Sequence, residues 1–107
     1  MSLTELRQDR CDHLGDDALV GLARRGSPGA IRAIIQRNNQ RLFRAVRSIL
    51  KDEAEAEDAL QDAYVRALSN LEGFKGEAGL STWLMRIAIN EALGRLRRRR
   101  EMIDIGD

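Results

Sequence analysis

Residues 73–100 read GFKGEAGLSTWLMRIAINEALGRLRRRR, a glycine-punctuated segment that runs into a strongly basic one. Apolar residues recur at helical spacing in its second half, which predicts an amphipathic helix from Thr82 to about Arg99. Ser81 is expected to cap this helix, and the two glycines within residues 74–80 favour a loop before it. The stretch therefore predicts a loop that leads into a helix ending in arginines.

A helix with an acidic front is expected to precede this loop. Asp52 is expected to cap it, with Glu55 three residues on in capping-box spacing, and Gly73 is expected to end it. One face is rich in alanine and is expected to lie close against neighbouring helices; it comprises Ala56, Ala59, Leu60, Ala63, Tyr64, Ala67, Leu68 and Leu71. The opposite arc comprises Asp58, Gln61, Asp62, Val65 and Ser69. By composition this arc fits a solvated face, and only Val65 points to a partner.

Two further helices are expected nearer the N-terminus. The first begins at Asp16 or Asp17, either of which can cap it, and ends at Gly26, a residue type common after helix C-termini. Ser27 then caps the second helix and Pro28 takes its first position, where the missing N–H group costs nothing.

The second helix is expected to run to about Lys51, with one apolar stripe of helical spacing. Asn38 falls inside this stripe, and we expect a core amide bonded to neighbouring backbone rather than a ligand contact. Together the helices predict a compact all-α bundle over residues 16–100, with three core helices and a short leading one. Residues 1–15 are expected to be a flexible lead-in, and residues 101–107 the start of an interdomain linker.

The overall composition agrees with a single helical domain. The chain has 107 residues, one proline and 4% aromatic residues, which fits an all-α domain better than a sheet protein. Its one cysteine, Cys11, excludes an internal disulfide and suits a reducing compartment. No apolar run approaches the length of a membrane span, and the N-terminus lacks the core of a signal peptide. We therefore expect a cytoplasmic protein without a membrane partner.

No arrangement of residues indicates catalysis, a metal or a cofactor. Cys11 and His13 lie two positions apart without a second pair of ligands, so they are expected to be ordinary surface residues. Asp58 and Asp62 share a helix face, but acids four positions apart are usually surface charges. A binding protein is the better interpretation.

The net charge of +1 conceals a strong segregation of charge. Six acids and no base lie between Asp52 and Asp62, whereas six arginines and one acid lie between Arg86 and Arg100. Such a basic helix supplies phosphate contacts, and Asn90 on it can reach a base edge. Next to it, Phe74, Lys75 and Trp83 are suited to holding an unstacked base. For Trp83, a role as a core plug remains equally open.

Residues 54–100, AEAEDALQDAYVRALSNLEGFKGEAGLSTWLMRIAINEALGRLRRRR, resemble region 2 of bacterial extracytoplasmic-function (ECF) sigma factors. The shared parts are the acidic-Gln-acidic helix with Tyr64, the F-x-G-x-x-x-x-S-T-W-L loop and helix start, and the R-I-A-x-N continuation. The earlier helices, from Asp16, resemble the first part of the same domain. The combination of these parts at this spacing is specific.

The resemblance implies a promoter-specificity subunit of RNA polymerase. In the family, the acidic helix docks on the clamp helices of the polymerase β′ subunit; the matching residues are Asp58, Gln61 and Asp62, with Tyr64, Val65 and Leu68 nearby. The loop and the following helix recognise the minus-ten promoter element and capture a flipped non-template base. The expected DNA-binding residues are Phe74, Lys75, Gly76, Glu77, Ala78, Gly79, Leu80, Ser81, Thr82, Trp83, Arg86, Asn90, Arg97 and Arg98.

The resemblance also implies features beyond this stretch. Family members carry a second helical domain that binds the minus-thirty-five element, and this chain ends at Asp107, where the connecting linker would begin. The chain is therefore expected to be either an excised domain or a naturally truncated protein, and we favour the first interpretation. An anti-sigma protein is a further expected partner, as is single-stranded promoter DNA. Two alternatives remain: a helical protein-interaction module whose arginines are merely solvated, and a duplex-DNA-binding regulator, whose short helix-turn-helix the Phe74–Leu80 loop does not resemble.

Overall fold

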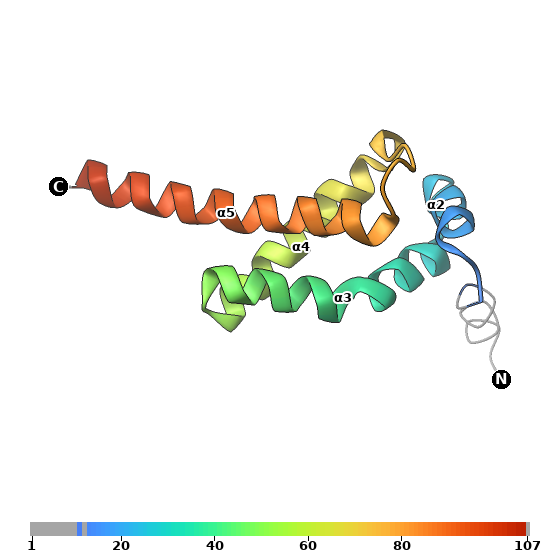
Figure 1. Cartoon of the computed structure of the whole chain (residues 1–107), viewed down its shortest axis with the longest axis horizontal. Coiled ribbons are helices and arrows are strands. Elements are labelled where there is room, and N and C mark those ends of the chain that lie inside the picture. Colours follow the sequence, from blue (N-terminus) through green and yellow to red (C-terminus); the bar gives the residue numbers. More distant parts are fainter. Residues whose placement is uncertain (1–10, 12, 107) are drawn as a thin grey trace.

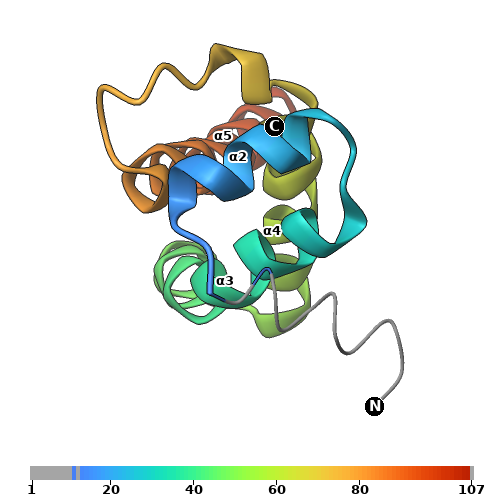
Figure 2. The ribbon, with the colours of Figure 1, turned by 90° about the vertical axis from the view of Figure 1, so that its right-hand side faces the viewer.

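The computed structural model describes residue 11 and residues 13–106, and this part of the chain is all-α, as predicted. In chain order the elements are α2 (Asp16–Arg24), α3 (Pro28–Leu50), α4 (Glu53–Ser69), the short 3-10 helix η1 (Leu71–Gly73) and α5 (Leu80–Gly106). Helices α3, α4 and α5 all pack against one another and form the core (Figure 1). Helix α2 contacts α3 and η1, and it lies across the end of the core beside the 74–80 loop (Figure 2).

The predicted caps of α3 and α4 are confirmed. The Ser27 side chain accepts a hydrogen bond from the Ala30 N–H at 3.3 Å, and Pro28 is the first helical residue. The Asp52 carboxylate accepts from the Glu55 N–H at 2.8 Å. Each bond satisfies one of the backbone donors that a helix start leaves free.

Two predicted caps are wrong. Helix α2 is preceded by Gly15 without a side-chain cap, and Asp16 and Asp17 lie inside its first turn, where their charges favour the positive end of the helix dipole. Helix α5 begins at Leu80, so Ser81 is already helical. The Ser81 hydroxyl instead donates to Asn38 Oδ1 of α3 at 2.6 Å, because this tertiary acceptor lies within reach.

Asn38 is 2% exposed and is a core amide, as predicted. Its Nδ2 donates to the Ile34 carbonyl at 2.8 Å, while its Oδ1 accepts from Ser81. Both ends of the amide are therefore satisfied, which removes most of the cost of burying it. The Asn38–Ser81 bond joins α3 to the start of α5.

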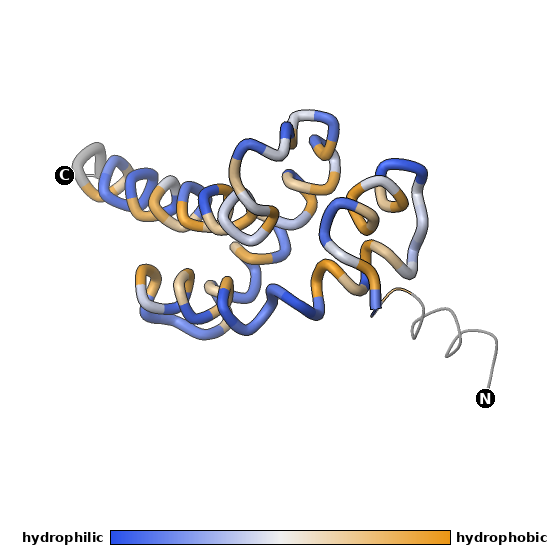
Figure 3. The backbone as a smooth tube through the Cα atoms, turned by 45° about the vertical axis from the view of Figure 1, so that its right-hand side comes forward, coloured by the Kyte–Doolittle hydropathy of each residue, from blue (hydrophilic) through white to orange (hydrophobic). Residues whose placement is uncertain are grey.

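The alanine-rich face of α4 is buried as predicted, and it lets α3 and α5 approach closely. On α5 the buried face is centred on Leu84, Ala88 and Ala92, whereas the neighbouring Leu93 turns outward and is 46% exposed. The hydropathy colouring alternates along α5 (Figure 3). Within the described residues, no helix is long and apolar enough to cross a membrane.

The two ends of the domain also differ from expectation. Helix α5 continues to Gly106, beyond the predicted end near Arg99, because the residues after the arginine run contain no helix breaker before that glycine. Cys11, expected at the surface, is 7% exposed and packs beside Gly29. The other positions of the predicted lead-in up to residue 10, and residue 12, lie outside the described residues.

Candidate functional site

The acidic helix and the arginine-rich helix lie side by side and are joined by ion pairs. Arg95 of α5 reaches Asp58 Oδ2 with Nη1 at 3.0 Å and Asp62 Oδ2 with Nη2 at 2.5 Å. Arg99 also pairs with Glu55. The Arg95 side chain is 16% exposed, whereas the two aspartates stay largely open to solvent. Part of the charge that is segregated along the sequence is thus neutralised between α4 and α5.

Glu91 lies at the centre of this ion-pair network and is 6% exposed. It accepts from Arg95 Nε at 3.3 Å, and Arg66 Nη2 of α4 lies 3.3 Å from its other oxygen. Burial of the Arg95 guanidinium lowers its pKa, but the hydrogen bonds with Asp58, Glu91 and Asp62 outweigh this effect and raise the pKa overall. Sequence reasoning missed the role of Glu91, although it is the lone acid in the arginine-rich stretch.

The residues expected to bind a polymerase divide by exposure. Asp58, Gln61, Asp62 and Val65 are exposed along α4, and we refer to them as the α4 ridge. Val65 is 66% exposed, which is unusual for a valine in the middle of a packed helix and is the most conspicuous feature of the ridge. The ridge presents two carboxylates followed by one apolar contact.

Tyr64 and Leu68 lie behind the ridge, because Tyr64 is buried and Leu68 is half-buried. The Tyr64 hydroxyl donates to Asn39 Oδ1 of α3 at 3.1 Å. Burial raises the pKa of Tyr64 to about 12. Tyr64 therefore holds α3 and α4 together and offers little surface to a partner.

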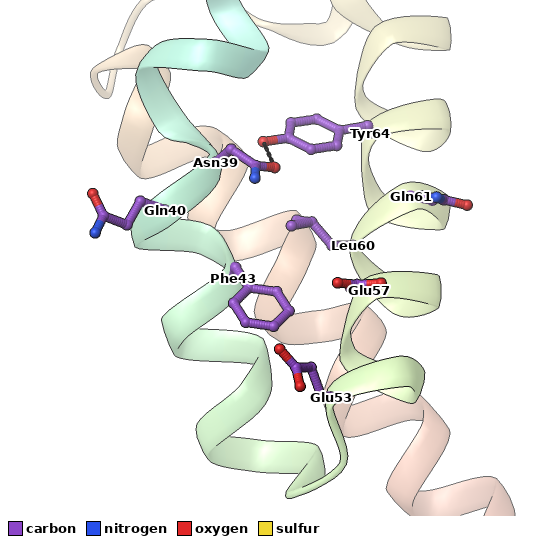
Figure 4. Close-up of a pocket in the computed structure, with 8 residues that line it drawn as sticks. All are labelled: Asn39, Gln40, Phe43, Glu53, Glu57, Leu60, Gln61 and Tyr64. Atoms are coloured by element: carbon purple, nitrogen blue, oxygen red, sulfur yellow. Dashed lines mark hydrogen bonds between the residues drawn. The ribbon is translucent and has the colours of Figure 1, made fainter.

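A groove of about 450 Å³ lies between α3 and α4, next to the α4 ridge (Figure 4). Phe43 of α3 and Leu60 of α4 extend into this α3–α4 groove, with the Glu53 carboxylate near the Phe43 ring (Figure 4). In contrast to the acids that face α5, Glu53 and Glu57 have no ion-pair partner among the described residues. Sequence reasoning missed Phe43, whose only signal was an aromatic residue just outside the apolar stripe.

The loop between η1 and α5 is anchored by two buried side chains. Phe74 is 7% exposed and Leu80 is 1% exposed, so both point into the core. The Phe74 and Trp83 rings pack with centroids 5.3 Å apart at 53°. The residues between these anchors are exposed apart from the half-buried Ala78, and Gly76 adopts a φ of 77°, which favours glycine.

A pocket of about 290 Å³ lies under this loop, and we refer to it as the loop pocket. Its lining comprises residues 73–78 together with Trp83 and Arg86. Trp83 is half-buried, so it closes the edge of the core and lines the pocket at the same time. The pocket offers an aromatic face beside an exposed guanidinium, a combination suited to a flat, partly polar ring near a phosphate.

The remaining nucleic-acid candidates lie along α5. Thr82, Arg86, Asn90 and Arg97 are exposed at spacings that place Arg86, Asn90 and Arg97 on one helix face. Arg98 is also exposed, with Nη2 3.9 Å from Glu91. Ser81 is half-buried and engaged with Asn38. The structure thus brings the loop pocket and a basic helix face together, with Phe74 lining the pocket from the core side and Leu80 and Ser81 anchoring the start of α5.

Comparisons with known proteins agree with one family. The family model described as Sigma-70 region 2 matches residues 34–102. The RNA polymerase sigma-H factor of Pseudomonas aeruginosa is 32% identical over 81 residues, which cover 76% of this chain and 42% of that protein. The ECF RNA polymerase sigma factor SigM of Mycobacterium tuberculosis is 37% identical over 73 residues, covering 68% of this chain and 37% of that protein. The chain spans about two fifths of the length of these curated relatives.

Proposed function

The chain belongs to the sigma-70 region 2 family, as a domain of the ECF sigma factor type, and from this premise we propose that it acts in transcription initiation. It binds the β′ clamp helices of RNA polymerase with α4 and takes up melted promoter DNA with the loop pocket and α5. Its role is binding and not catalysis. The proposal places it in the cytoplasm, where it meets polymerase and DNA.

The polymerase half of the proposal rests on the α4 ridge, and Val65 is the single observation that carries it. Val65 is 66% exposed next to Asp62, so a partner that covers it would bury apolar surface beside a carboxylate. The α3–α4 groove extends the same surface, because Glu53 and Glu57 offer carboxylates without an ion-pair partner among the described residues beside the apolar Phe43 (Figure 4). A basic helix with some apolar side chains is the complementary partner. An anti-sigma protein would act by covering this ridge.

The DNA half rests on the loop pocket and the exposed face of α5. A base that leaves the stack can lie against Trp83 inside the pocket, while Arg86 and Arg97 bind backbone phosphates. Only an unstacked strand can place a base there. The domain therefore binds melted DNA more tightly than duplex DNA, and this difference in affinity shifts the equilibrium toward melted DNA without consuming energy.

A ternary-complex titration tests the whole proposal. A fluorescent single-stranded oligonucleotide is titrated with the domain, in the presence and absence of a purified β′ clamp-helix fragment, and a duplex of the same sequence serves as the control. We expect the single strand to bind more tightly than the duplex, and its fluorescence anisotropy to rise further when the clamp fragment joins the complex; an unchanged anisotropy would contradict the polymerase half of the proposal. Tighter binding of the duplex would support a duplex-binding regulator, and binding of neither DNA would support a plain protein-interaction module.

A further inference from the structure

Arg24, the last residue of α2, ties this helix to the start of the 74–80 loop. Its guanidinium donates three hydrogen bonds to backbone carbonyls: Nε to Leu71 O at 3.2 Å, Nη2 to Leu71 O at 2.9 Å and Nη2 to Phe74 O at 2.6 Å. These bonds span 47 to 50 positions in the sequence. A charged donor makes stronger hydrogen bonds than a neutral one, so this contact constrains both carbonyls.

The two carbonyls determine where Phe74 lies. Leu71 begins η1 and Phe74 follows its last residue, so the Arg24 guanidinium holds the backbone on both sides of this turn. The Phe74 ring packs against Trp83 and forms a wall of the loop pocket. A shift of the Phe74 backbone would therefore open the contact with Trp83 and change the shape of the pocket.

The far end of the loop has its own anchor, and the middle has none. Leu80 is buried and Ser81 donates to Asn38, so the start of α5 is fixed on α3. Residues 75–78 make no hydrogen bond to the rest of the described chain. Without Arg24, the first half of the loop would be held only by the hydrogen bond from the Phe74 N–H to Leu71 O and by the packing of the Phe74 ring.

Arg24 lies outside the segment that matches the family model, which begins at residue 34. We propose that Arg24 is a positioning residue for base capture: it fixes Phe74 against Trp83 and so gives the loop pocket its shape before DNA arrives. Helix α2 is then part of the DNA-binding apparatus rather than packing support alone. This inference rests on the proposed function for the ligand, but the positioning itself is a property of the free protein.

Arginine is suited to this task because its planar fork reaches two acceptors at once. A lysine keeps the charge but donates from a single point, and a glutamine loses the charge as well. Arg25 provides a matched control, since it is the next residue, is exposed, and has no side-chain partner among the described residues. Arg24→Gln and Arg25→Gln remove the same charge from nearly the same place.

The test uses Trp83, the single tryptophan of the chain, as a local probe. Emission wavelength and acrylamide quenching are measured for the wild type, Arg24→Lys, Arg24→Gln and Arg25→Gln, at a temperature where thermal unfolding shows each to be folded. The same proteins are titrated with four dT oligonucleotides that carry A, C, G or T at the central position. We expect Arg24→Gln to shift Trp83 emission to the red, increase quenching and lose the base preference, with Arg24→Lys intermediate and Arg25→Gln like the wild type.

The outcomes separate positioning from stability and from charge. Equal Trp83 signals in Arg24→Gln and Arg25→Gln would overturn the proposal, as would a lowered melting temperature in Arg24→Gln with unchanged emission and base preference. If Arg24→Gln does not fold, Arg24→Lys decides the question. An Arg24→Lys protein with the same Trp83 emission and base preference as the wild type would overturn the proposal. Another outcome is a changed Trp83 signal in Arg24→Gln while the wild type itself shows no base preference. That result would support positioning by Arg24 and contradict the DNA half of the proposed function.

Discussion

Asp62 on α4 and Arg95 on α5 form an ion pair of 2.5 Å that joins the helix proposed to bind polymerase to the helix proposed to bind DNA. The same guanidinium also holds Asp58 and Glu91, so a single arginine ties three carboxylates together. Two of the residues expected to contact a partner are therefore already engaged within the domain. A change at either aspartate alters the α4–α5 contact as well as the surface.

The Asp62–Arg95 pair is expected to contribute modestly to stability. Because Asp62 is 56% exposed, a double-mutant cycle of Asp62→Asn and Arg95→Gln should give a coupling of about 0.5–1 kcal/mol. Urea unfolding measures it, and Glu57→Gln, which removes an unpaired acid from the same helix, should leave stability nearly unchanged. Strict additivity of the two changes would show that the pair contributes nothing.

Loss of Glu91 is expected to cost more, because its carboxylate is 6% exposed and the arginines around it would lose their shared acceptor. Glu91→Ala should destabilise the domain by about 2–3 kcal/mol. Thermal unfolding checks this, with Glu57→Ala as an exposed control on α4. A melting temperature equal to that of the control would contradict the central role assigned to Glu91.

The Ser81–Asn38 bond predicts an asymmetric mutational effect. Ser81→Ala leaves the 2% exposed Asn38 with an unsatisfied oxygen, which should cost about 1–3 kcal/mol in the free energy of unfolding. If Ser81 were a helix cap, the loss would not depend on Asn38. We therefore expect Ser81→Ala to cost less in an Asn38→Ala background, and equal costs in both backgrounds would refute the bond.

Tyr64 should make stability depend on alkaline pH. Its pKa is raised from 10.0 to about 12, so between these values the folded state binds the proton more tightly than the unfolded state. The resulting stabilisation is fully present below pH 10 and is lost as the pH rises through about 12. Ultraviolet titration of this single tyrosine measures the pKa. Tyr64→Phe should remove this part of the pH dependence, and a midpoint near 10 would contradict the burial effect.

Most of the fold could be predicted from local sequence signals. The features that could not be predicted depend on partners far apart in the sequence. Ser27 and Asp52 were predictable as caps because the backbone N–H groups that donate to their side chains lie only three residues away. Ser81 has the same local signature, but its hydroxyl prefers Asn38, 43 positions distant. A sequence pattern does not reveal which distant atom competes with a local cap.

The candidate site was predictable as a set of residues but not as an arrangement. The acidic arc and the arginine run were evident, yet their mutual ion pairs depend on α4 and α5 lying side by side. Phe74 and Leu80 resembled exposed loop residues because nothing local marks them as anchors, whereas they are buried. Arg24 carried no signal, since its partners are backbone carbonyls with no sequence signature.

The central claim, that α4 binds the polymerase, is tested most directly at Val65, which takes part in no ion pair or hydrogen bond that a substitution would break. A purified β′ clamp-helix fragment is titrated with the wild type, Val65→Lys and Leu93→Lys. Leu93→Lys is the control, because it replaces another exposed apolar residue that lies outside the α4 ridge. We expect Val65→Lys to weaken binding about tenfold or more, which corresponds to about 1.4 kcal/mol, and Leu93→Lys to bind like the wild type. Equal affinities for all three proteins, or no binding by the wild type at low salt, would contradict the claim.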